Sequence, residues 1–214
     1  MDADEEQLEA LQKWWKENGR TIIAGVVIGL GGVFGWNYYR AQSEREAEQA
    51  SRVYEQMVDM AAADDHLEAL ARADLLMREH AESGYATLAG LLAAKSAMAA
   101  GQRDAAERSL RWVVDNGDRA ELKDVARLRL ARLLIDADDL GASLALLDQV
   151  SAGEFSGSVR ELRGDAYRAQ GRADAARDAY AAALASDALD PETRARVQMK
   201  LDDLGRTDFV GTSQ

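Results

Sequence analysis

The sequence predicts an all-α protein, in which one N-terminal transmembrane helix precedes an α-solenoid of about four helix pairs and a C-terminal capping helix. Three observations support this fold class. The chain contains one proline and is rich in the strong helix formers Ala, Leu, Glu and Arg, and no segment alternates β-branched with polar residues as a strand does. Residues 21–39 contain no charged side chain. The segments that follow them repeat at a nearly constant interval.

The composition excludes several classes of function. The 214 residues carry a net charge of −12, which argues against a nucleic-acid partner, because binding phosphates requires clustered Lys and Arg. The chain has no cysteine, so a thiol nucleophile, a disulfide and a thiolate metal site are all excluded. Nearly half of the residues are apolar, which is enough to form a packed core.

Residues 1–20 are expected to form a short amphipathic segment. Leu8, Leu11, Trp14 and Trp15 fall near one side of a helix, and charged residues occupy much of the remainder. This pattern is typical of a helix that lies at a membrane surface, and an extension of the following membrane helix is the alternative. The segment is acidic and no A-x-A-like site follows the apolar run, so we expect an uncleaved anchor and not a signal peptide.

Residues 21–39 are expected to form the transmembrane helix. Nineteen residues span roughly 29 Å of helix, close to the ~30 Å hydrocarbon core of a bilayer. Arg20 and Arg40 bracket the segment, and tryptophans and tyrosines flank it as amphipathic rings do at an interface. A phosphate-binding loop is not supported, because no Lys or Ser/Thr follows the glycines and Phe34 replaces the third glycine of a dinucleotide fingerprint.

Five glycines in this segment favour a face on which a second transmembrane helix packs. Gly25 and Gly29 form one G-x-x-x-G motif that Gly32 extends, and Gly31 and Gly35 form another. The alternative is that small residues merely accumulate in membrane spans. Membrane lipid is an expected partner of this segment. The orientation stays open, because Lys and Arg are equally frequent on the two flanks.

Residues 40–205 are predicted to be a helical repeat domain, and residues 206–214 a flexible tail. The clearest repeat lies at residues 158–187, where glycine, tyrosine and alanine are spaced as in a tetratricopeptide repeat. We expect small residues where the two helices of a pair meet, tyrosines between pairs, and glycine in the turn. The residues with these packing roles are Gly164, Tyr167, Gly171, Ala176, Tyr180 and Ala183, with Gly101 and Ala106 in an earlier repeat.

The turns between paired helices define the period of the repeats. They are expected at Asp64, Gly101, Asp138 and Gly171, which lie 37, 37 and 33 residues apart. This is close to the period of about 34 residues in tetratricopeptide repeats. After the last repeat, a capping helix should begin at Pro191, with Asp190 as its N-cap.

The first helix of each pair is expected to line the concave side of the solenoid. An apolar groove with a few basic side chains would suit an extended or helical segment of another protein. The alternative is that these apolar side chains pack inside the solenoid. The residues of this predicted groove are Leu88, Leu91, Lys95, Met98, Leu128, Arg132 and Ile135.

No motif in the chain predicts catalysis, a cofactor or a metal site. His66 and His80 are the only histidines, and neither H-E-x-x-H nor G-x-S-x-G occurs. The cluster of Asp64, Asp65 and His66 falls in a predicted turn, where a solvated turn and N-cap explain it better than a bound metal. We therefore do not expect an enzyme.

The block DEEQLEALQKWWKENG (residues 4–19), the glycine-rich span and the repeats together resemble the YfgM family, the ancillary subunit of the SecYEG translocon. The resemblance covers nearly the whole chain. It implies a single-pass protein of the bacterial inner membrane, with its N-terminus in the cytoplasm and its repeats in the periplasm. It also implies association with the SecYEG translocon and with the membrane-anchored periplasmic chaperone PpiD.

A scaffold that passes exported polypeptides to periplasmic chaperones is the first functional hypothesis, because a membrane tether raises the local concentration of a weak binder. One alternative is a tethered regulator that sequesters a signalling protein. Another is an assembly factor of a different envelope complex.

Overall fold

The computed structural model describes the backbone of residues 2–151, 153–187 and 189–211. It describes the side chains of these residues except at 2–13, 17, 20–24, 26, 41, 43 and 206–211. The chain divides into two units, Met1–Gln49 and Ala50–Gln214. The first unit is helical throughout its described part, and the second holds the remaining helices.

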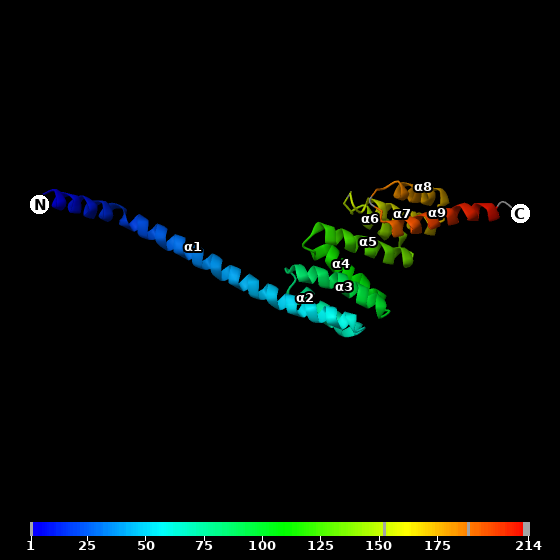
Figure 1. Cartoon of the computed structure of the whole chain (residues 1–214), viewed down its shortest axis with the longest axis horizontal. Helices are drawn as coiled ribbons and strands as arrows, with labels where there is room; N and C mark the ends of the chain where they lie inside the picture. The colour runs from blue at the N-terminus through cyan, green and yellow to red at the C-terminus, as the bar shows by residue number, and fades with distance from the viewer. Residues whose placement is uncertain (1, 152, 188, 212–214) are drawn as a thin grey trace. The chain divides into compact units, whose positions relative to one another are not determined.

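The described residues are all-helical, as the sequence predicts, and the helices of the second unit form a tetratricopeptide-like solenoid (Figure 1). The helices are α1 (Asp2–Ala62), α2 (His66–Glu79), α3 (Gly84–Ala99), α4 (Arg103–Asn116), α5 (Ala120–Asp136), α6 (Leu140–Leu147), α7 (Ser156–Ala169), α8 (Ala173–Leu184) and α9 (Pro191–Gly211). From α2 to α9, each helix packs against the next, and α5 also contacts α7. The predicted tail at 206–214 is helical through Gly211.

Four tight turns join the paired helices. They contain Asp64, Gly101, Asp138 and Gly171, whose φ angles are 61°, 72°, 61° and 73°. In each turn the backbone N–H of the next residue donates to the carbonyl five positions earlier, at 2.7 to 2.9 Å. This is the bond of a Schellman motif, which satisfies a carbonyl that the helix end leaves free. Turn geometry therefore repeats in all four pairs.

The two turns that contain aspartate use a second aspartate as the N-cap of the next helix. The side chain of Asp65 accepts from the N–H of Glu68 at 3.4 Å, and the side chain of Asp139 accepts from the N–H of Ala142 at 3.2 Å. Asp190 does the same for α9, where it accepts from the N–H of Thr193 at 2.9 Å. That hydrogen bond holds the pKa of Asp190 below its ordinary value.

Small side chains allow the helices to approach closely in the core. Gly164 lies directly under the ring of Tyr180, and a Cβ at residue 164 would lie 2.4 Å from Cε1 of that ring. Tyr180 is fully buried, whereas Tyr167 is half-buried and stacks against the guanidinium of Arg172 at 4.7 Å. The alanines Ala106, Ala176 and Ala183 are also fully buried.

Candidate functional site

The candidate site is a pocket of about 330 Å³ in the second unit, formed by α5, α7 and α9. Charged side chains dominate its lining. The lining residues are Arg132, Ile135 and Asp136 from α5, Asp165, Arg168 and Ala169 from α7, and Lys200 from α9. Because α5 and α7 are the first helices of successive pairs, the pocket lies where one repeat meets the next.

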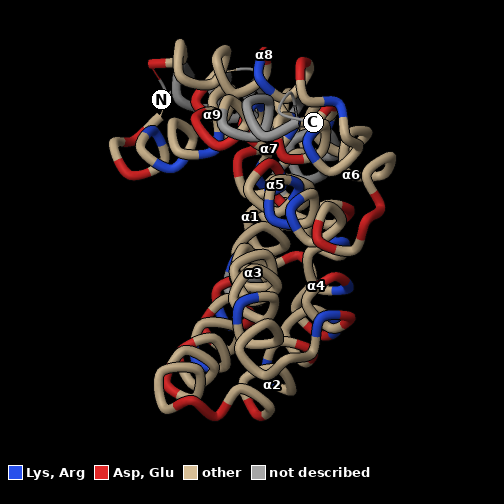
Figure 2. Tube along the Cα trace, turned by 90° about the vertical axis from the view of Figure 1, so that its right-hand side faces the viewer, with Lys and Arg blue, Asp and Glu red and all other residues tan. Residues whose placement is uncertain are grey.

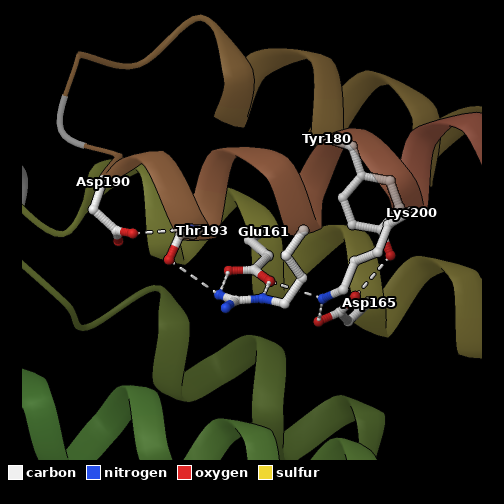
Figure 3. A network of polar contacts seen from close by, with 7 residues as sticks. Glu161, Asp165, Tyr180, Asp190, Thr193 and Lys200 are labelled. Atoms are coloured by element: carbon white, nitrogen blue, oxygen red, sulfur yellow. Dashed lines mark hydrogen bonds and ion pairs between the residues drawn. The ribbon is translucent and has the colours of Figure 1, made fainter.

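Two rows of opposite charge hold α9 against α7 beside this pocket. Glu161 and Asp165 are four residues apart on α7, and Arg196 and Lys200 are four residues apart on α9, so each pair shares a helix face. Lys200 Nζ donates to Glu161 Oε1 at 2.8 Å and to Asp165 Oδ2 at 2.7 Å (Figure 3). Arg196 donates to both carboxylate oxygens of Glu161, at 2.9 and 3.0 Å.

Glu161 is ionised although it is only 1% exposed. Burial by itself raises the pKa of this carboxyl, but the hydrogen bonds from Arg196 and Lys200 outweigh burial and bring the pKa below its ordinary value. The hydrogen bond with Glu161 raises the pKa of Arg196. The buried carboxylate thus connects the last helix to the last repeat.

Tyr180 extends this network into the core. Its hydroxyl donates to Asp165 Oδ1 at 2.7 Å, and burial together with the nearby carboxylate raises its pKa (Figure 3). Tyr180 therefore stays protonated and acts as a hydrogen-bond donor. Lys200 lies 5.9 Å from the centre of its ring, so the ring and both carboxylates surround one ammonium group.

Most charges that line the pocket have partners, but two do not. Asp136 is 3.9 Å from Arg103, while Asp165 and Lys200 pair with each other. Arg132 and Arg168 are exposed, and within the described part of the chain neither side chain has a hydrogen bond or an ion pair. The pocket therefore offers two free guanidinium groups.

Comparison with known proteins gives the family. The model of the tetratricopeptide repeat-like domain family matches residues 12–206. A protein of Aggregatibacter actinomycetemcomitans is 30% identical, over 83% of this chain and 86% of its own length. Proteins of Haemophilus influenzae and Escherichia coli are 29% and 28% identical, each over 94% of this chain and 97% and 96% of their lengths. All three are named ancillary SecYEG translocon subunit.

The chain belongs to the YfgM family of ancillary SecYEG translocon subunits. This confirms the family that residues 4–19, the glycine-rich segment and the repeats indicate. The tetratricopeptide repeat-like domain of the family is a fold that typically acts without catalysis. Among the described side chains of this YfgM protein, no group of three or more His, Asp or Glu is placed to hold a metal ion.

The structure buries some residues of the predicted groove of this YfgM protein and leaves others exposed. Leu91 is buried in the core, and Leu88, Leu128 and Ile135 are half-buried. Leu128 and Ile135 pack against a core cluster that includes residues of α6 and α7. The polar or flexible members Lys95, Met98 and Arg132 are exposed. Of the seven residues, Arg132 and Ile135 line the pocket.

Sequence reasoning missed Arg168 and Lys200 as members of the site. The available signal was the spacing of four between Glu161 and Asp165 and between Arg196 and Lys200, which predicts one charged stripe per helix. That the two stripes face one another depends on α9 folding back onto α7. Figure 2 shows that acidic and basic residues are interspersed along the helices, so charge alone does not single out these two rows.

The five glycines of the predicted span lie on α1 in the first unit and are exposed there. A Cβ added at Gly25, Gly29, Gly31, Gly32 or Gly35 would meet no atom within 4 Å. Large apolar side chains of the same stretch are also exposed, among them Ile28 at 74% and Phe34 at 71%. Among the residues searched, which are the described ones, no helix reaches the length and hydropathy of a membrane span. Residues 21–24 and 26 of the predicted span lie outside the described side chains.

Proposed function

We propose that this chain is a membrane-anchored scaffold of the SecYEG translocon that connects exported polypeptides to the periplasmic chaperone PpiD. The observation that carries the proposal is the match along almost the whole chain to relatives named ancillary SecYEG translocon subunit. The fold supports it, because solenoids of this kind present extended surfaces that bind other polypeptides. The chain makes contacts between proteins and does no chemistry.

The proposed anchor is the uncharged segment at residues 21–39. Its exposed side chains support this role, since Ile28 and Phe34 in contact with lipid remove their apolar surface from water. The glycine face of Gly25, Gly29 and Gly32 has open space around it, which would let a translocon helix approach closely. The proposed topology has the N-terminus in the cytoplasm and the repeats in the periplasm, as the family resemblance implies.

A topology reporter tests the location of the repeats. A reporter enzyme that is active only outside the cytoplasm would be fused after Gln214. Activity is the expected result. An inactive but stable fusion would place the repeats in the cytoplasm, rule out a relay to periplasmic chaperones, and leave sequestration of a cytoplasmic signalling protein as the better hypothesis.

Co-purification tests the association itself. We expect Gly25→Leu combined with Gly29→Leu to reduce recovery of SecYEG with the tagged full-length chain, because two leucines keep a partner helix at a distance. Val27→Trp is the control, since residue 27 lies on the opposite side of the helix and gains a bulky side chain there. Equal recovery of SecYEG with all forms would move recognition from this face to the repeat unit. No recovery of SecYEG with the unmodified chain would refute the proposal.

A further inference from the structure

We propose that the pocket between α5, α7 and α9 binds a carboxylate of a partner polypeptide, and that Arg132 and Arg168 are its two donors. The ligand would be an acidic side chain or the free C-terminus of the partner. The inference rests on the proposed function, because it names the chemistry that the scaffold recognises in another protein.

The first argument is the balance of charges around the pocket. Glu161 and Asp165 are neutralised by Lys200, which donates to both at 2.8 and 2.7 Å, together with Arg196, which donates to Glu161. The guanidinium groups of Arg132 and Arg168 are left without a carboxylate among the described residues. Guanidinium groups present planar forks of N–H donors that match a carboxylate, so two of them beside one pocket favour an anionic group.

The second argument is the size and the lining of the pocket. A volume of about 330 Å³ is at the lower end of the range for ligand pockets, so the pocket suits one side chain or a chain end better than a helix. Ile135 and Ala169 add apolar surface between the charged groups. An aliphatic stem that ends in a carboxylate, as in glutamate, would contact both kinds of surface.

The third argument concerns which anion fits. Asp136 and Asp165 also line the pocket, and residues 40–214 carry a net charge of about −9. This field repels a phosphate dianion or a polyanion more strongly than a single carboxylate. The position also fits a polypeptide, because Arg132 and Arg168 lie on the first helices of two successive pairs, which the sequence predicts to line the concave side of the solenoid.

The test is a binding measurement on the full-length chain in detergent micelles. The probe is a fluorescein-labelled alanine peptide with one glutamate and a free C-terminus, and its binding is measured by fluorescence anisotropy. Three companion peptides carry glutamine in place of glutamate, an amidated C-terminus, or both changes. We expect the acidic peptide to bind and the neutral, amidated peptide not to bind. The two intermediate peptides then show whether the side chains or the chain end supply the carboxylate.

Variants assign the binding to the two arginines. We expect Arg132→Gln and Arg168→Gln each to weaken binding of the acidic peptide by about tenfold, since each removes a charge-assisted hydrogen bond. Arg108→Gln on α4 is the matched control, because Arg108 is exposed, has no ion pair among the described residues and does not line the pocket. Its affinity should equal that of the unmodified chain. Circular dichroism verifies that all variants remain helical.

Several results would overturn the inference. One is that the neutral amidated peptide binds as tightly as the acidic peptide. Another is that both arginine variants bind the acidic peptide as tightly as the unmodified chain does. A third is that the folded chain binds none of the peptides. Competition by inorganic phosphate where acetate does not compete would reassign the pocket to phosphate. Recovery of SecYEG separates this inference from the proposed function. A folded chain that fails to bind the peptide but still recovers SecYEG refutes only the pocket, and a chain that binds the peptide without recovering SecYEG refutes only the scaffold.

Discussion

Gly164→Ala is the substitution whose consequence the structure defines most sharply. The new Cβ would lie 2.4 and 2.5 Å from Cε1 and Cδ1 of Tyr180, which is far inside ordinary contact distance. The neighbouring atoms belong to a rigid ring that is fully buried, and the hydroxyl of this ring donates to Asp165 at 2.7 Å. Relief of the clash therefore requires α7 and α8 to move apart or Tyr180 to lose its hydrogen bond.

The expected net effect is a loss of up to about 4 kcal/mol in the free energy of unfolding. Overpacking in a filled core costs about 1–3 kcal/mol. Weakening the hydrogen bond to the Asp165 carboxylate adds up to about 2 kcal/mol. Alanine in place of glycine inside a helix returns about 1 kcal/mol, which reduces the total.

Urea denaturation of the full-length chain in detergent, followed by far-UV circular dichroism, measures this loss. Gly141→Ala in α6 is the control, because a Cβ there meets no atom within 4 Å, and it should be neutral or stabilising by up to about 1 kcal/mol. Tyr180→Leu combined with Gly164→Ala should cost less than the sum of the single changes, since the smaller side chain makes room. Equal stability of Gly164→Ala and the unmodified chain would show that the close contact does not determine the packing of this pair.

Two further predictions concern the turns between paired helices and the buried carboxylate of Glu161. Gly171→Ala places a Cβ at a φ of 73° and should destabilise the chain by about 1 kcal/mol, whereas Asp138→Gly at a φ of 61° should leave the midpoint of urea denaturation unchanged or raise it. A lower midpoint for Asp138→Gly would contradict this explanation of the turns. Glu161→Gln should destabilise the chain at pH 7 by about 1–3 kcal/mol, less than a fully buried pair costs, because the side chains of Arg196 and Lys200 are 43% and 21% exposed. Folding lowers the pKa of Glu161, so this carboxylate stabilises the chain fully above about pH 4.5, its pKa in the unfolded chain, and the stabilisation is lost as the pH falls further. The urea midpoint of the Glu161→Gln variant should therefore fall less steeply with decreasing pH than that of the unmodified chain. Parallel acid profiles of the two proteins would refute the assignment.

Much of the repeat architecture could be predicted from residues that interact locally. All four turns contain a residue with positive φ, namely Asp64, Gly101, Asp138 or Gly171. Glycine and aspartate adopt this conformation more readily than most residues, so the turns can be read from residue type. The N-cap at Asp190 is equally local, because its partner is three residues away. The family was predictable for a different reason, since the resemblance extends along nearly the whole chain.

The groove was harder to predict, because helical periodicity shows which residues share a side but not what covers that side. Leu91 is on the predicted concave stripe and is nevertheless buried, because α3 packs against α2 and α4 at once and little of its surface stays free. Arg132 and Ile135 share their stripe with Leu128, and their surroundings depend on α7 and α9, which lie later in the chain.

The sequence by itself determined the helical class, the period of the repeats, the lack of cysteine chemistry and the family. These properties depend on residue type and on contacts within a few residues. The tertiary structure alone decided which charges are neutralised. Glu161 meets Arg196 only because α9 folds back across 35 residues of chain, and the strength of such a pair depends on distance and burial. Arg132 and Arg168 are distinguished from other exposed arginines in the same way, since the packing of α7 against α5 brings both to the lining of one pocket.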